Sequence, residues 1–434
     1  MLPITIIFSL IGIGILAAAH EIGHFLVAKS LGIKVYELSI FVGPKLFSFK
    51  KKGIEYNIRM IPFGAYVRFS DFEEEEDTSD DPSHILNQPR WKRLLVSLAG
   101  PLMNVLLGVL ILTILFSVSG YYTTIQRDIY PNTQLEGTAA QAGDRIISIN
   151  GQRVYTEYDM YAEISVTDPE ENLTVGFRSA DSGKRYSVVL VPDLQTVSRI
   201  GISHLSELTE EGGWKVVAVD PRQNQGNPVI MNGDTVLRIN GVSVSDPEIA
   251  RVVDSAYADT VTVDVLRDGT EYSFLIVPFT EVITNSRGFD PKPGEGLLEA
   301  VREAAVFPLA MFRLTVFSVR SAISGDLEPY NVVSGPVGMV TIVSDVVSEP
   351  NVDNSVKIES LALIAAVISI GLAITNLLPL PGLDGSDLIM LVIETIRGKK
   401  LSKKAERVIN IVGFAVIILL VSFALTSDII RLFK

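Results

Sequence analysis

The chain has 434 residues, 47% of them hydrophobic and 20% charged, and its formal net charge is −13. This hydrophobic share is too high for an ordinary soluble protein with so many charges, so the apolar and the charged residues must occupy different segments. The sequence contains no cysteine, which excludes disulfide bonds and thiolate metal ligands and leaves the redox compartment open.

The first apolar segment, residues 4–28, contains the motif His20-Glu21-Ile22-Gly23-His24. A run of about 25 residues is long enough to cross a bilayer as a helix. Since residues four apart share one helix face, His20 and His24 can bind one Zn²⁺, and Glu21 beside them can act as general base for a metal-activated water. The alternative is a polar patch that only contacts other helices, but ionisable groups inside a span are energetically expensive and are usually functional.

A basic stretch follows the first span, and two alternating segments in it, residues 45–49 and 54–60, predict a β-hairpin. Lys51-Lys52-Gly53 between them predicts the turn. The hairpin either lies on the protein surface or enters the membrane beside the metal site. In the second case, an edge strand that contains Tyr56 and Ile58 would pair with an unwound substrate by strand addition.

The acid-rich segment 72–81 predicts a solvated linker, and the apolar segment 94–117 predicts a second span. The small residues Ala99 and Gly100 in this span permit close helix packing. Asn104 is a polar group among apolar neighbours and should face the other helices, where packing is its expected role.

Residues 121–293 differ from the flanking segments, because short alternating runs replace the long apolar ones. A nine-residue pattern that begins at Gly143 recurs at Gly233 as Gly-Asp-x-(Ile/Val)-x-x-Ile-Asn-Gly. Each copy predicts a strand that ends in an Asn-Gly turn. Two copies predict two small β-rich domains, at residues 121–195 and 196–293, rather than a solenoid.

The segment 294–357 connects these domains to the next span. Within it, residues 299–323 are apolar but are interrupted by Arg302, Arg313 and Arg320, which predicts an amphipathic helix on the membrane surface. If this helix crossed the membrane instead, every later segment would change sides. We have no interpretation of the sequence Ser334-Gly335-Pro336-Val337-Gly338 near its end.

Two further spans are predicted at residues 358–378 and 408–425, with a basic cluster from Lys399 to Lys404 between them. Basic loops stay in the cytoplasm, so four spans place this cluster and the basic stretch after span one inside, and the acidic region 121–293 outside. Asp384 is a carboxylate that follows the third span after a Pro-x-Pro break, and it could provide a further metal ligand. The same arrangement brings it and the histidine motif to one depth, toward the cytoplasmic side. A fifth span would separate them.

Two distant motifs together resemble the site-2 protease family of intramembrane zinc metalloproteases: the histidine motif in the first span, and the pattern Asn-x-x-Pro-x-Pro-x-Leu-Asp-Gly at residues 376–385. The resemblance implies His20, His24 and Asp384 as zinc ligands and Glu21 as the catalytic base. It also implies that Asn376 positions the substrate. The family usually has a second glycine where this chain has Ser386, which leaves Asp387 as a rival ligand.

The repeated nine-residue pattern resembles PDZ domains, which bind extended peptides; in the family such a tandem is regarded as a size filter. The resemblance therefore implies a polytopic α-helical membrane protein with four transmembrane helices, a membrane-associated β-hairpin (residues 43–70) and two small β-rich PDZ-like domains. Residues 1–120 and 358–434 would form the membrane domain.

The resemblance implies that this enzyme cleaves transmembrane segments of single-span proteins in a bacterial cytoplasmic (inner) membrane. The substrate would be an anti-sigma factor after a first extracytoplasmic cut, or a remnant signal peptide. The expected partners are such a transmembrane protein and the lipid bilayer, not nucleic acid, and the oligomeric state stays open. The alternative function is a non-catalytic membrane-anchored PDZ scaffold that binds exported peptide tails, which would not need Glu21.

Overall fold

The computed structural model of the chain describes residues 2–69, 82–165, 167–168, 170–192, 194–208, 212–246, 260–284, 286–324, 335–348, 353–399 and 402–432. The predicted acid-rich linker, residues 72–81, lies outside these ranges. Contacts divide the chain into two compact units. The first consists of Met1–Ile125, Arg145–Ile164 and Pro291–Lys434, and the second of Gln126–Asp144 and Ser165–Asp290.

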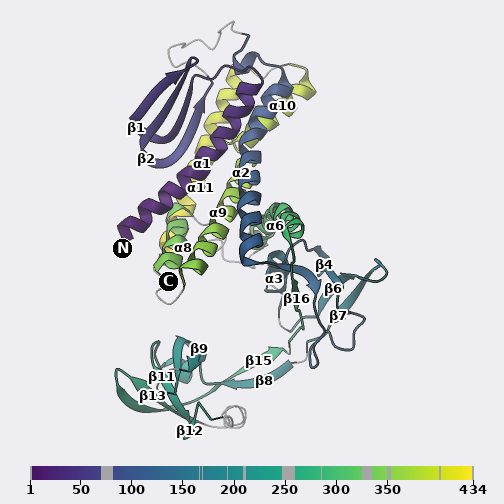
Figure 1. Cartoon of the computed structure of the whole chain (residues 1–434), viewed down its shortest axis with the longest axis vertical. Coiled ribbons are helices and arrows are strands. Elements are labelled where there is room, and N and C mark those ends of the chain that lie inside the picture. The colour runs from purple at the N-terminus through teal and green to yellow at the C-terminus, as the bar shows by residue number, and fades with distance from the viewer. Residues whose placement is uncertain are drawn as a thin grey trace. The chain divides into compact units, whose positions relative to one another are not determined.

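The first unit contains the long helices of the protein (Figure 1). These are α1 (Leu2–Ser30), α2 (Arg90–Ser119), α6 (Leu297–Ser324), α8 (Pro336–Ser348), α9 (Asn354–Asn376), α10 (Asp384–Arg397) and α11 (Lys403–Leu432). Among the described residues, five helices are long and apolar enough to cross a membrane: α1, α2, α6, α9 and α11. Four of them coincide with the predicted spans, and the chain is a helical membrane protein with β-sheet regions.

The fifth of these helices, α6, is the segment predicted to lie on the membrane surface. Its Arg313 forms ion pairs with Asp159 and Glu163 of the short helix α3 (Glu157–Ser165). Both carboxylates are buried. Because a charged cluster is easier to accommodate beside a polar domain than within lipid, these ion pairs support the surface placement.

Small residues let the helices of this unit approach closely. Gly23 of α1 faces the backbone of α2, where a Cβ atom would lie 2.4 Å from the carbonyl oxygen of Ala99. Gly108 of α2 faces Ile370 of α9 in the same way, at 2.6 Å. The predicted role of small residues in helix packing is therefore confirmed. The core formed by α2, α6 and α9 contains the buried residues Leu112, Phe116, Ala300, Ala304, Phe307, Ala366 and Ile370.

The predicted hairpin is present as β1 (Glu37–Lys51) and β2 (Ile54–Arg68), which pair antiparallel and lie beside α1 (Figure 1). Lys52 and Gly53 form the turn with positive φ angles of 51° and 80°. Both strands are longer than predicted and fold back on each other. Residues 37–40 pair with residues 65–68 and also with residues 55–58.

This register corrects one prediction. Residues 55–58 pair with the arm of β1 after residue 45 as well as with residues 37–40, so they form an interior strand. The expectation that Tyr56 and Ile58 lie on a free edge is wrong, because their backbone groups have partners on both sides. The final part of β2, residues 61–68, pairs only with residues 37–42 among the described residues. This segment is therefore the edge strand of the sheet.

The repeated pattern forms strands and tight turns, as predicted. In the first unit β3 (Tyr122–Gln126) pairs with β4 (Arg145–Ile149), β4 pairs with β5 (Gln152–Arg153), and β16 is Pro291–Pro293. The Asn-Gly pairs after β4 and after β11 (Thr235–Ile239) have positive φ angles, 47° and 77° at Asn150-Gly151 and 48° and 79° at Asn240-Gly241. These are the angles of two-residue hairpin turns.

The second unit consists mainly of strands. They are β6 (Leu173–Arg178), β7 (Arg185–Leu190), β8 (Leu194–Arg199), β9 (Ile202–Leu208), β10 (Trp214–Val219), β11 (Thr235–Ile239), β12 (Val242–Ser243), β13 (Val261–Arg267), β14 (Thr270–Ile276) and β15 (Phe279–Thr284), with the short helix α4 (Gln223–Gly226). One sheet has the order β14-β13-β11-β10-β9, with β12 paired to β11, while β8 pairs with β15 and β6 with β7.

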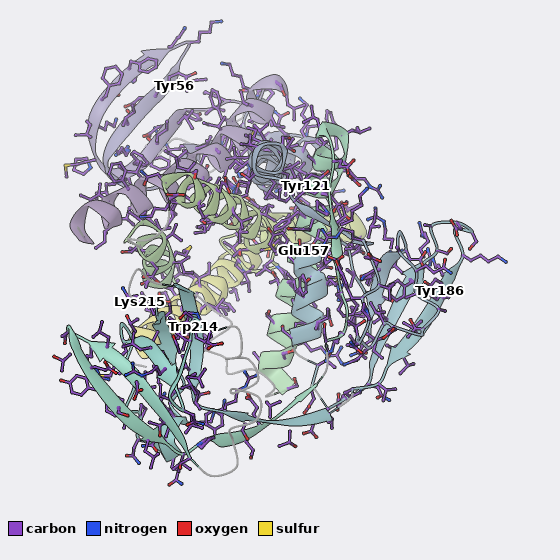
Figure 2. All side chains as sticks on the ribbon, turned by 60° about the horizontal axis from the view of Figure 1, so that its bottom comes forward. Tyr56, Tyr121, Glu157, Tyr186, Trp214 and Lys215 are labelled. Atoms are coloured by element: carbon purple, nitrogen blue, oxygen red, sulfur yellow. The ribbon has the colours of Figure 1, made fainter. Side chains whose placement is uncertain are left out.

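The aspartates of the two repeats have equivalent roles. Asp144 accepts a hydrogen bond from the backbone N–H of Gln141, and Asp234 accepts one from the N–H of Met231. Each carboxylate thus closes the turn before its strand. Figure 2 shows Trp214 and Lys215 on β10 and Tyr186 on β7, in the strand-rich part of the chain. The boundaries predicted for the two β-rich domains stay predictions.

The charged cluster on α6 gives a stability prediction. In the Arg313→Gln protein the buried carboxylates of Asp159 and Glu163 lose their cation, so we expect the free energy of unfolding to fall by about 3 kcal/mol. Thermal unfolding of the full chain in detergent measures this change. Arg320→Gln is the control, because Arg320 is exposed on the same helix. Equal stability of the two variants would contradict the assigned role of Arg313.

Candidate metal centre

Three potential ligand atoms from two distant segments converge in the first unit. The Nε2 atoms of His20 and His24 lie 3.1 Å apart, and the Oδ2 atom of Asp384 lies 2.9 Å and 3.3 Å from them. Atoms bound tetrahedrally to one Zn²⁺ at about 2.0–2.1 Å are roughly 3.3 Å apart. Asp384 Oδ2 is buried, yet it accepts no hydrogen bond of good geometry. The donor set and its spacing therefore fit a shared metal ion.

His24 is oriented by the backbone of α2. Its Nδ1 atom lies 2.7 Å from the carbonyl oxygen of Val96. A carbonyl oxygen can only accept a hydrogen bond, so Nδ1 carries the proton and Nε2 presents its lone pair to the metal.

His20 is oriented by Asn104, which is fully buried. The amide nitrogen of Asn104 lies 3.4 Å from His20 Nδ1, while its amide oxygen has no hydrogen-bond donor. Turning the amide by 180° exchanges the two atoms, and the oxygen then accepts a hydrogen bond from Nδ1–H. This orientation gives the amide oxygen a donor and leaves His20 Nε2 free for the metal. Asn104 therefore belongs to the site, although the sequence favoured a packing role.

Gly100 of α2 makes room for both imidazole rings. A Cβ atom at this position would lie 2.3 Å from His24 Nε2 and 2.6 Å from His20 Nε2. Any side chain here would occupy the space of the metal-binding atoms.

Asp384 reaches the histidines because the chain breaks after α9. The helix ends at Asn376, and α10 begins at Asp384 itself. Gly385 is required for the tight return, since a Cβ atom there would lie 2.2 Å from the carbonyl oxygen of Leu378. Ser386 replaces the glycine usual in the family, and its hydroxyl donates to the carbonyl oxygen of Leu383 at 2.9 Å. The substitution is thus accommodated within the loop.

Asp387, the rival ligand, is placed differently from Asp384. Both line a cavity of about 520 Å³ between α10 and α11. Only Asp384 also lines the cavity of about 220 Å³ that contains His20, Glu21, Asn104 and Asn376. The geometry therefore favours Asp384 as the ligand.

Glu21 is held by the edge strand of the sheet. Its Oε2 atom accepts a hydrogen bond of 3.0 Å from the backbone N–H of Val67. Gly64 and Ala65 of the same strand line the small cavity with Glu21. The edge strand 61–68 thus borders the site directly.

A buried polar network fixes this strand within the sheet. The Oε1 atom of Glu37 accepts hydrogen bonds from Ser39, Asn57, Arg59 and Tyr66, at 2.6 to 2.8 Å. Because Tyr66 precedes Val67, the network fixes the position of the N–H group that contacts Glu21.

The predicted site residues fall into two groups. His20, Glu21, His24, Asn376 and Asp384 all line or border one cavity. In contrast, Tyr56 and Ile58 do not line it. Tyr56 lies on the sheet, as Figure 2 shows, and its ring stacks on that of Phe49 with centroids 5.0 Å apart.

His20, Glu21 and His24 lie close enough together to hold a metal ion, and Asp384 joins them through its contacts with both histidines. His84 accepts a hydrogen bond from the N–H of Leu86 at the start of a short 3₁₀ helix, Ile85–Asn87.

Comparisons with known proteins identify the family of the chain. The model of Peptidase family M50 matches residues 8–420. The zinc metalloprotease RasP of Geobacillus kaustophilus is 25% identical over 461 aligned positions, which cover 99% of this chain and 98% of the relative. The regulator of sigma E protease of Haemophilus influenzae is 24% identical, with 98% of each chain covered. A putative zinc metalloprotease of Treponema pallidum is 25% identical over 99% of this chain and its own full length.

One solved structure is similar to part of the chain. It is the HtrA3 PDZ domain bound to a phage-derived ligand, which is 21% identical and covers 21% of this chain and 92% of its own. The TM-score is 0.18, which does not establish the fold of either β-rich region.

The close contact of Gly100 with His20 and His24 gives a metal-binding prediction. In the Gly100→Ala protein the added methyl group overlaps the imidazole nitrogens, so we expect zinc affinity to fall at least about tenfold. Zinc content after dialysis against a graded chelator measures the change. Gly371→Ala is the matched control, since a Cβ atom at Gly371 meets nothing within 4 Å. Retention of zinc by the Gly100→Ala protein would contradict the geometry.

The network around Glu37 gives a second prediction. Replacing a charged acceptor of several hydrogen bonds should loosen the strand 61–68, so the amide of Val67 in the Glu37→Gln protein should exchange with deuterium about tenfold faster. Hydrogen exchange with mass spectrometry reads this segment. Glu55→Gln is the control, because Glu55 pairs with Lys45 elsewhere on the sheet. Unchanged exchange in the Glu37→Gln protein would show that the network does not hold the strand.

Proposed function

The chain belongs to Peptidase family M50 and is an intramembrane zinc metalloprotease, and we propose that His20, His24 and Asp384 hold its zinc while Glu21 is the catalytic base. One observation supports the assignment most strongly. Three ligand atoms from two distant segments lie within 3.3 Å of one another, and Glu21 borders the same cavity. Binding of a metal ion explains why these groups converge in an apolar helix bundle.

The mechanism follows from the positions of the side chains. Bound zinc supplies a Lewis acid that polarises the scissile carbonyl and acidifies a water molecule. Glu21 accepts the proton from the attacking water and passes it to the leaving nitrogen. The hydrogen bond from Val67 occupies Oε2 of Glu21 and leaves Oε1 for this proton. Asn376, whose amide nitrogen lies 3.5 Å from the ring of His20, is placed to hydrogen-bond the substrate backbone.

The substrate is held in an extended form by the edge strand 61–68. Helical substrates hide their carbonyl groups in hydrogen bonds, so the segment to be cut must unwind. Among the residues that the structure describes, no second strand pairs with the outer side of the strand 61–68, which borders Glu21 through Val67, Gly64 and Ala65. Strand addition at this edge, rather than at residues 54–60, aligns an unwound backbone with the metal.

The exposed face of the sheet supports a position within the membrane. Large apolar side chains are exposed there, including Leu46, Phe47, Met60 and Phe63. A patch of this kind on a sheet beside α1 is suited to contact with lipid.

The substrates are single-span membrane proteins. A relative of this chain is named regulator of sigma E protease, which supports an anti-sigma factor as one substrate. Remnant signal peptides are a second class. The chain is a multi-pass membrane protein, placed in a bacterial cytoplasmic membrane with its basic loops inside. Its two β-rich domains lie outside as a PDZ tandem that excludes intact ectodomains.

The separate roles of ligand and base give a clear test. The Glu21→Gln protein should retain zinc and lose cleavage of a single-span model substrate by at least about a thousandfold, because proton transfer contributes about 10²–10⁴ to the rate. The Asp384→Asn protein should lose both zinc and activity, while Asp387→Asn should keep both. Zinc content and gel-based cleavage of the reconstituted protein measure these outcomes.

Two results would overturn the proposal. Full cleavage activity of the Glu21→Gln protein would exclude Glu21 as the catalytic base. Zinc retained in Asp384→Asn but lost in Asp387→Asn would transfer the ligand role to Asp387.

A further inference from the structure

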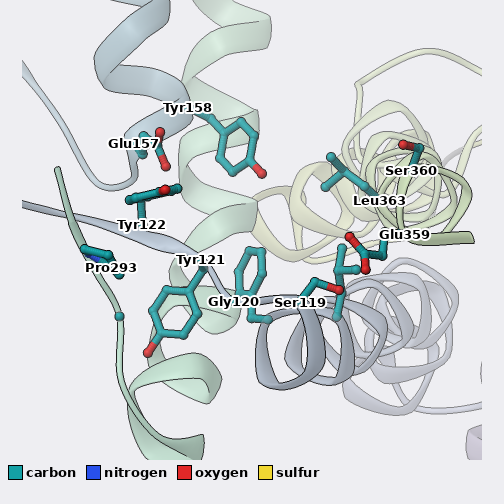
Figure 3. A pocket seen from close by; sticks show the side chains of 13 residues that line it. Ser119, Gly120, Tyr121, Tyr122, Glu157, Tyr158, Pro293, Glu359, Ser360 and Leu363 are labelled. Carbon is teal, nitrogen blue, oxygen red and sulfur yellow. The ribbon is translucent and has the colours of Figure 1, made fainter. Parts of the chain in front are cut away.

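A second cavity lies at the opposite end of α2 from the metal centre. Its volume is about 430 Å³, and its lining comes from the end of α2, the start of β3, α3, β16 and the start of α9. Figure 3 shows Glu157, Tyr158 and Tyr122 on one side of the opening and Glu359, Ser360 and Leu363 on the other. All of these residues belong to the first unit.

Two carboxylates in this cavity lack a cation. Among the described residues, no hydrogen bond or ion pair involves the side chain of Glu157 or of Glu359, and no lysine or arginine lines the cavity. Burial raises the pKa of Glu157 because it disfavours the charged carboxylate, and a cation bound beside the carboxylate would oppose this shift. The nearby Arg313 is already paired with Asp159 and Glu163. The cavity therefore has no positive group of its own to pair with its two carboxyl groups.

The walls of the cavity are aromatic and apolar. Tyr121, Tyr122 and Tyr158 contribute rings, and Leu115, Phe116 and Leu363 contribute apolar surface. The ring of Tyr121 packs on Phe116 with centroids 5.4 Å apart, which fixes one wall. Aromatic faces attract organic cations, and apolar surface suits the aliphatic stem of lysine or arginine. A metal ion fits less well, because the described residues provide no group of three ligands here.

We propose that this cavity binds a lysine or arginine side chain of the substrate, next to the outer end of its transmembrane segment. This proposal rests on the proposed function. A lipid ammonium group is the competing ligand, but it carries a phosphate close by. The cavity offers no basic residue to pair with that phosphate, and its two carboxylates would repel it. A basic side chain of a protein has no such anion attached.

The distance between the two sites makes the proposal specific. Asn104 at the metal centre and Ser119 at the cavity both lie on α2, and Asn376 and Glu359 lie correspondingly on α9. At 1.5 Å per helical residue, these pairs are separated by roughly 22–26 Å. If the substrate stays helical between the two sites, its basic residue should lie about 15–17 positions from the cleaved bond, toward the outer side of the membrane. Unwound residues span a longer distance each, so unwinding would reduce this number. Outer flanks of membrane spans have few basic residues, so such a residue distinguishes one substrate from another.

The test uses the full-length protein in vesicles and model single-span substrates that differ at one position of the outer flank. With lysine instead of glutamine there, we expect KM to fall about fivefold to tenfold with kcat unchanged, as for a desolvated cation on aromatic rings. The Glu157→Gln and Glu359→Gln proteins should lose this preference. The Glu359→Lys protein should instead favour a substrate with glutamate at that position. Glu170→Gln, an exposed glutamate outside the cavity, is the control.

Equal KM values for the lysine and glutamine substrates, or a preference that survives both glutamine variants, would overturn the proposal. A dependence on phosphatidylethanolamine that is the same for every substrate would assign the cavity to a lipid and would also overturn it. Cleavage of the glutamine substrate by the wild type tests the proposed function separately. The affinities of both substrates for the Glu21→Gln protein test the role of the cavity even if no substrate is cleaved.

Discussion

The structure depends on the convergence of His20, His24 and Asp384 within an apolar helix bundle. An ionised carboxylate and two imidazoles cannot be buried there without compensation, because the free energy of moving charge out of water is large. A divalent cation bound by all three would compensate them at once. It would also join α1 to the start of α10, which are separated by most of the chain. In this proposal the catalytic site and the association of the membrane helices rely on the same interaction.

The surrounding residues serve this interaction by leaving space and by fixing orientation. Gly100 gives room to the imidazole nitrogens, and Gly23 lets α2 approach the helix that carries them. Val96 and Asn104 hold the other ring nitrogens of the two histidines. Metal sites commonly need such outer partners, because they set the tautomer and the basicity of each ligand. The second helix is thus as much a part of the centre as the first.

Much of the centre could be predicted because its chemistry needs fixed spacing. The interval between His20 and His24, and the proline break before Asp384, are visible in the sequence. The role of Asn104 could not be predicted, because a single polar residue in a span is compatible with helix packing or with a functional site. The edge strand 61–68 was missed because residues 37–42 were not recognised as its partner. That pairing moves Tyr56 and Ile58 into the interior of the sheet.

The most direct measurement is zinc X-ray absorption on the Asp384→Cys protein. Because the natural chain has no cysteine, any sulfur bound to zinc must come from position 384 or from one of the 8 methionines. Wild-type protein is the reference and controls for methionine. The account predicts a shell of nitrogen and oxygen at about 2.0–2.1 Å in the wild type, and a new sulfur at about 2.3 Å in the variant. Zinc bound by the variant without sulfur in its first shell would contradict the convergence on which the account rests.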